Sequence, residues 1–192
     1  MGTRGLYGLR RIGMDKVTYN HFDSYPDVLG KSVVEFCSQT TEEAMKRFYD
    51  KIVLVDETST PSQDQISFCQ RAEMVDTSVG GGTTRDWYCI LRGLQGDLAK
   101  TFAISEKYGK AYMIDNRGFI EDSLFCEYAY IINLDTHKLE FWVGFQKTPD
   151  YTNRYGTHSD GEYYPCRLAL EIPLFDTKDV DEVVRRMNAV SQ

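Results

Sequence analysis

The chain has 192 residues, of which 42% are hydrophobic and 27% are charged, and its formal net charge is −7. This length fits one domain, residues 1–192, with a core that needs no disulfide or metal. The acidic balance disfavours nucleic-acid binding, which requires a basic surface, and no apolar run could cross a bilayer. The N-terminus lacks a hydrophobic signal segment and the cysteine pattern fits reduced thiols, so we expect a cytoplasmic protein.

Two short runs with strand character, 3–11 and 15–21, open the chain around a turn at Gly13. The pattern predicts an antiparallel hairpin. Gly5 and Gly8 lie inside the first run, where glycine marks a bulge or a close backbone approach. The second run leads into a dense cluster of polar and aromatic side chains: Tyr19, Asn20, His21, Phe22, Asp23, Ser24 and Tyr25.

Capping residues and helical spacing of apolar residues predict about five helices. Asp176 or Thr177 is expected to cap the last of them, and Gly96 to end or interrupt the fourth. The glycine-rich connection 76–84 is expected to be the most flexible part of the chain. The first four helices are expected at about 26–38, 41–52, 62–73 and 86–106.

The remaining strands are expected in the second half of the chain. The run 127–134 is apolar on both faces and is therefore predicted to be a central strand. A long loop, 147–164, is rich in Tyr, Gly, Asp, Asn and Thr, and loops of this length are more often functional or mobile than simple connections. Together the elements predict an α+β fold, with an antiparallel sheet sandwich covered by helices. The other expected strands are 110–114, 139–146 and 166–173.

A second polar cluster, Asp115, Asn116 and Arg117, lies in a tight turn between apolar segments. Arg117 could hold a carboxylate or phosphate of a substrate, and the alternative is a turn with a solvated arginine. We place this cluster beside the hairpin by hypothesis, as the other polar turn embedded between apolar strands.

Cysteine and histidine patterns predict neither disulfides nor a metal site. The cysteines are odd in number and have apolar or aromatic neighbours, which is typical of reduced, buried thiols. The three histidines are scattered and have no cysteine partners, so zinc is not expected. No cofactor is expected either. The five cysteines are Cys37, Cys69, Cys89, Cys126 and Cys166.

The opening MGTRG and the later YNHFDSYP resemble a group of uncharacterised bacterial and phage proteins. The hairpin with Thr3 near its start, and Asn20 and Asp23 at its end, also resembles N-terminal nucleophile hydrolases. That resemblance implies an αββα fold and amide-bond hydrolysis by a terminal nucleophile whose amine acts as the base. Gly2 has no side chain, so Thr3 could serve only after Gly2 is removed or with another base.

The resemblance implies roles for the residues of the hairpin. Thr3 would attack an amide carbonyl, Asn20 would stabilise the oxyanion, and Asp23 would orient His21 or an amine as base. Catalysis could also have been lost. The alternative is a non-catalytic phage or bacterial binding protein that captures a small ligand or a host protein. The residues expected to bind the substrate or ligand are Arg4, Tyr19, Tyr25, Asp115, Asn116 and Arg117.

Overall fold

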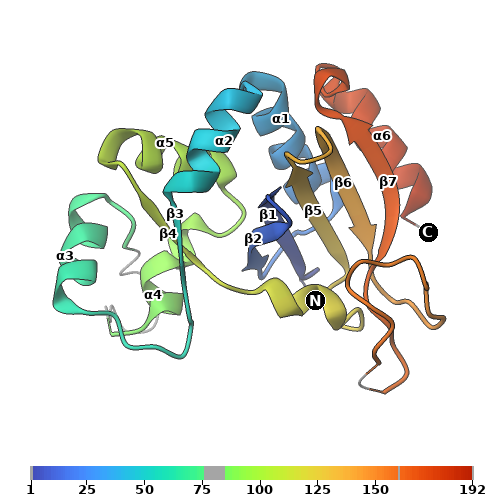
Figure 1. Cartoon of the computed structure of the whole chain (residues 1–192), viewed down its shortest axis with the longest axis horizontal. Coiled ribbons are helices and arrows are strands. Elements are labelled where there is room, and N and C mark those ends of the chain that lie inside the picture. Colours follow the sequence, from blue (N-terminus) through green and yellow to red (C-terminus); the bar gives the residue numbers. More distant parts are fainter. Residues whose placement is uncertain (1, 76–84, 160, 192) are drawn as a thin grey trace.

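The computed structural model describes residues 2–75, 85–159 and 161–191, so the predicted flexible stretch 76–84 lies outside the described residues. The fold is α+β, as predicted. Figure 1 shows two parts side by side, a larger one built on a five-stranded sheet and a smaller one built on two strands. The N-terminal end of the chain lies at the edge of the larger part, below its sheet in this view.

The five-stranded sheet has the strand order β2-β1-β5-β6-β7. β1 and β5 pair in parallel, whereas the other neighbours are antiparallel. The sheet is therefore mixed, and it is a single layer, not the predicted antiparallel sandwich. The parallel pairing arises because the chain leaves the opening hairpin, crosses through helices, and returns along β1. The strands are β1 (Gly5–Arg11), β2 (Met14–Asn20), β5 (Tyr128–Asn133), β6 (Lys138–Val143) and β7 (Arg167–Pro173).

β1 is hydrogen-bonded on both sides, to β2 and to β5. The first strand is thus inside the sheet, and β5 is its central strand, both as predicted. Gly5 is required by packing, since a Cβ there would lie 2.6 Å from Ser24 Cβ and 2.7 Å from the Tyr128 carbonyl oxygen. The hairpin turns at Ile12 and Gly13, both with positive φ, the geometry of a tight two-residue turn. The Asp135 carboxylate accepts both N–H groups of this turn, at 2.7 and 2.9 Å.

Helices cover one face of this sheet. Tyr7, Leu9, Tyr130 and Phe141 point from the strands into the largest hydrophobic cluster, which the helices close. A π-helical turn (Pro26–Gly30) leads into the first of these helices. The regular α-helix therefore begins at Lys31, and not at about residue 26 as predicted. The covering helices are α1 (Lys31–Gln39), α2 (Glu42–Lys51) and α6 (Val180–Val190).

The opposite face of the sheet is covered without a regular helix. A short 3₁₀ turn (Arg117–Glu121) and Tyr155 of the long loop pack over Leu6, Val17, Ile131 and Trp142. The loop therefore contributes Tyr155 to the core packing of this face, whereas most of its other described residues are exposed.

The smaller part has its own hydrophobic cluster. Two parallel strands, β3 (Ile52–Val55) and β4 (Ala111–Ile114), form its sheet. Their carboxyl ends point toward β2, where the Asn116 N–H donates to the Val17 carbonyl (3.2 Å). The two parts thus meet along the outer edge of the opening hairpin. The helices of this part are α3 (Gln63–Arg71), α4 (Trp87–Leu91) and α5 (Leu98–Tyr108).

All five cysteines are free and buried, as predicted. Burial raises the pKa of the Cys69 thiol to about 11, and Lys110 only partly offsets this. Within the described residues, no helix combines the length and the apolar character needed to cross a membrane.

Candidate functional site

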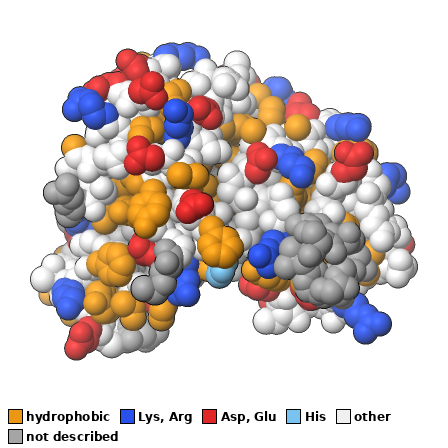
Figure 2. Space-filling view, turned by 180° about the vertical axis from the view of Figure 1, so that it is seen from behind, with side chains coloured by type: hydrophobic (Ala, Val, Ile, Leu, Met, Phe, Trp, Pro, Cys, Tyr) orange, Lys and Arg blue, Asp and Glu red, His pale blue; other side chains and the backbone are white. Residues whose placement is uncertain are grey.

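The clearest candidate site is an open cleft where the two parts meet, with a volume of about 400 Å³. Figure 2 shows the surface hollowed between the parts at its lower edge, with hydrophobic side chains beside the hollow. The volume is within the range of small-molecule sites. We call this the interlobe cleft; it is lined by Arg4, Tyr19, Glu57, Tyr88, Asn116, Phe119 and Phe125.

Asn116 fixes the base of the interlobe cleft. Its side-chain oxygen accepts hydrogen bonds from the Tyr19 backbone N–H (3.0 Å) and the Thr18 hydroxyl (3.2 Å). These bonds connect the segment after β4 to the edge strand β2. They also give the Tyr19 N–H, which faces away from β1, a hydrogen-bond acceptor. Asn116 therefore holds the two walls of the cleft together, a role that its place in a turn did not predict.

Arg4 forms the positively charged side of the cleft. Its backbone is held by Glu127 through two hydrogen bonds, of 3.3 and 3.1 Å. Its guanidinium lies 5.3 Å from the centre of the Phe125 ring, a distance at which a cation is attracted to an aromatic face. Among the described residues, no carboxylate forms an ion pair with it. The guanidinium donors of Arg4 are thus available to an anionic group in the cleft.

Aromatic rings form most of the remaining wall. The Tyr19 ring meets the Phe119 ring edge-on, with centroids 5.1 Å apart. The Tyr19 hydroxyl lies 2.8 Å from Nδ1 of His21. Burial raises the pKa of Tyr19; the positive charge of Arg4 opposes this, and Tyr88 and Glu57 add to it. Tyr19 therefore remains a neutral phenol at physiological pH.

A narrow cavity of about 30 Å³ continues inward from the cleft, enough for about one water molecule. It shares Tyr19, Glu57, Tyr88 and Asn116 with the cleft, and Thr101 and Gln95 line its inner part. A ligand could therefore place a small polar group there.

Asn20 does not face the interlobe cleft. Its amide nitrogen donates to the Phe22 carbonyl and to the Ser24 hydroxyl (2.9 Å). Ser24 is fully buried, and its backbone N–H donates to the Thr3 carbonyl (3.2 Å). The polar cluster after β2 is thus a turn held by the hydrogen bonds of the Asn20 side chain. These bonds stabilise the positive φ of 53° at Asp23.

The predicted nucleophile is inaccessible in this arrangement, since Thr3 is only 2% exposed. Asp23 and Asn20 line a different surface groove, of about 760 Å³, between α1 and α5. The exposed Tyr25 ring packs near Tyr128, with centroids 6.1 Å apart. Of the hairpin residues predicted to form a site, Arg4 and Tyr19 line the cleft together. His21 does not line it but is hydrogen-bonded to the Tyr19 hydroxyl.

The second predicted cluster is divided between two places. Asn116 lines the interlobe cleft, whereas Arg117 forms an ion pair with Asp115 (2.7 Å). That pair borders a shallow depression beside Asp15 and Tyr155. Arg117 therefore has a carboxylate partner within its own turn and is not directed at the interlobe cleft.

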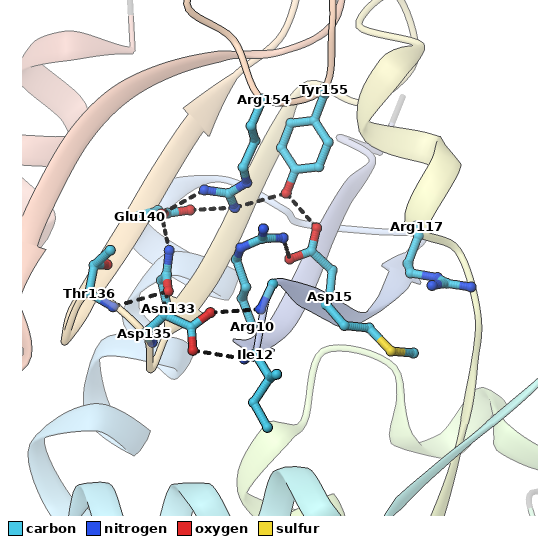
Figure 3. A network of polar contacts seen from close by, with 12 residues as sticks. Arg10, Ile12, Asp15, Arg117, Asn133, Asp135, Thr136, Glu140, Arg154 and Tyr155 are labelled. Atoms are coloured by element: carbon cyan, nitrogen blue, oxygen red, sulfur yellow. Dashed lines mark hydrogen bonds and ion pairs between the residues drawn. The ribbon is translucent and has the colours of Figure 1, made fainter.

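A buried polar network on the sheet was not predicted from the sequence (Figure 3). Arg10 pairs with Asp15 (2.9 Å), whose second oxygen accepts from the Tyr155 hydroxyl (2.7 Å). Arg154 pairs with Glu140 (2.6 Å), which is 3% exposed at its side chain. The only sequence signal was a charged residue inside the apolar strand LEFWV. The network attaches the loop 147–164 to the sheet and is structural.

Within the described residues, no group of three or more His, Cys, Asp or Glu side chains could hold a metal ion. Comparison of the chain with protein-family models, with curated proteins and with solved structures finds no match. The functional interpretation therefore depends on the chemistry of the interlobe cleft itself.

Proposed function

We propose that this chain is a binding protein whose interlobe cleft captures a small ligand that carries a flat ring and an anionic group. The observation that carries this proposal is the Arg4 guanidinium, which lies on the Phe125 ring without a carboxylate partner among the described residues. A partly buried arginine of this kind favours carboxylate or phosphate ligands, because its donors form a planar fork.

The walls of the cleft support a planar ligand. Tyr19, Tyr88, Phe119 and Phe125 present aromatic surface around Arg4. Aromatic side chains contribute large contact area with little loss of conformational entropy, and rings pair favourably with other rings. Asn116 supports preorganisation, because its side-chain oxygen already bonds two groups of β2, so little ordering is needed on binding.

Two observations favour binding over hydrolysis at the hairpin. The side chain of Thr3 is enclosed, whereas a nucleophile must meet the substrate carbonyl. The amide nitrogen of Asn20, the predicted oxyanion donor, already donates to two groups of its own turn. An oxyanion donor must instead point at the oxygen of the reacting group.

The amide-hydrolase alternative, with an Ntn-type αββα relationship, remains a prediction from the sequence. One feature favours it: the start of the chain lies beside the cleft, since Arg4 lines it. Incubating wild type and Thr3→Ala with a metabolite mixture tests this alternative. A product formed by wild type and lost in Thr3→Ala would support hydrolysis by Thr3.

Native mass spectrometry of the purified protein tests the binding proposal. We expect wild type to retain an anionic, ring-containing small molecule, or to acquire one from a metabolite mixture, and to release it unaltered. Arg4→Ala should lose it. Arg117→Ala is the matched control, because that arginine pairs with Asp115 outside the cleft, and it should bind like wild type. Equal binding by Arg4→Ala would refute the proposal.

A further inference from the structure

The interlobe cleft contains two opposite charges that do not neutralise each other. Arg4 precedes β1 in the larger part, and Glu57 follows β3 in the smaller part. Both line the cleft, yet among the described residues neither Arg4 nor Glu57 forms an ion pair, and Glu57 is exposed to solvent. The Tyr19 phenol lines the same cleft, and its pKa is raised by burial, lowered by Arg4 and raised by Glu57.

We infer that the interlobe cleft selects zwitterionic ligands with an aromatic ring, of the aromatic α-amino acid type. This inference rests on the proposed binding function and specifies its ligand class. The carboxylate of such a ligand pairs with Arg4, its ammonium group pairs with Glu57, and its ring lies among the aromatic side chains.

Each contact has a physical basis. A carboxylate matches the planar donors of a guanidinium, and an ammonium group needs acceptors, which the Glu57 carboxylate supplies. The cleft volume of about 400 Å³ is sufficient for a bicyclic ring with a short side chain. A ligand with both charges also leaves neither Arg4 nor Glu57 desolvated without a partner, whereas a simple anion would place its charge near Glu57.

Three probes with the same ring test this inference by isothermal titration calorimetry. Tryptophan carries both charges, indole-3-propionate only the carboxylate, and tryptamine only the ammonium group. We expect wild type to bind tryptophan about two- to fivefold more tightly than indole-3-propionate, as for an ion pair with a solvent-exposed carboxylate. Glu57→Gln should remove this preference while indole-3-propionate binds at least as tightly as before.

Two further variants complete the design. Arg4→Ala should weaken both acids and leave tryptamine binding unchanged or tighter. Glu43→Gln neutralises an exposed carboxylate of α2 away from the cleft and should preserve the wild-type preference.

The outcomes separate the inference from the function on which it rests. The binding function stands if indole-3-propionate binds wild type and Arg4→Ala weakens that binding. The zwitterion inference is wrong if, in that case, tryptophan binds no more tightly than indole-3-propionate, or if Glu57→Gln retains the preference for tryptophan. If none of the three probes binds wild type, both are wrong.

Discussion

Replacing Arg154 by methionine should destabilise the fold by about 2–4 kcal/mol. The reason is Glu140, whose side chain is 3% exposed and would lose its cation. Removing one partner of a buried ion pair costs roughly 3–5 kcal/mol, because it leaves an uncompensated charge. We expect a somewhat smaller cost here for two reasons. Asn133 and Trp142 still donate to Glu140, at 2.7 and 3.1 Å, and the Arg154 side chain is 26% exposed.

The assay is urea unfolding followed by tryptophan fluorescence, with a second variant to isolate the charge. In Glu140→Gln/Arg154→Met the uncompensated charge is absent, so this double variant should be more stable than Arg154→Met. Arg185→Met is the matched control, because its partner Glu182 is exposed on α6, and surface pairs contribute little. A double variant no more stable than Arg154→Met would refute the account of the network.

Three further predictions concern the opening segment. Deleting residues 1–8 should lower stability by several kcal/mol, since it removes half of a strand paired on both sides; unchanged thermal unfolding would contradict this. Asn20→Ala should cost about 1–3 kcal/mol in urea unfolding, because buried Ser24 loses its donor; loss of ligand binding at unchanged stability would be the contrary result. Two turn N–H groups lower the pKa of Asp135. Its stabilising effect is therefore present above about pH 3.9, the unfolded value, and is lost as pH falls through the lower folded value. Asp135→Asn should destabilise the hairpin by at most about 1 kcal/mol at neutral pH, with solvent screening, and by less in acid; a difference independent of pH would refute this.

Local patterns predicted most of the elements of the fold. Alternation of apolar residues placed the opening hairpin and the central strand 127–134 close to their observed limits. Ser62 with Gln65 forms the predicted capping box, and Asp86 caps α4 as predicted. These features depend on residues a few positions apart, which is the range over which sequence periodicity carries information.

The long-range arrangement was not predictable in the same way. The parallel pairing of β1 with β5 joins residues more than one hundred positions apart, and no local pattern distinguishes it from an antiparallel sheet. The sequence interpretation also expected the loop 147–164 to be functional or mobile because of its length, whereas Arg154 and Tyr155 attach it to buried carboxylates on the sheet.

The candidate site was only partly predictable for the same reason. Arg4 and Tyr19 were proposed because the hairpin places them near each other, and they do line the cleft. Glu57 and Tyr88 were missed, because they belong to the smaller part and reach the cleft only through the contact of β4 with β2. Thr3 and Asn20 are residue types that often act in catalysis, but here Thr3 is buried and the Asn20 amide is hydrogen-bonded within its own turn.

The central claim is that the interlobe cleft is a ligand site, and chemical-shift mapping tests it most directly. Adding indole-3-propionate to ¹⁵N-labelled protein should shift the backbone amides of Arg4, Tyr19, Asn116 and Phe125, and these shifts should disappear in Arg4→Ala. The groove beside Asp23 and Glu35 serves as the internal comparison. Shifts confined to that groove, or no shifts at saturating concentration, would contradict the account.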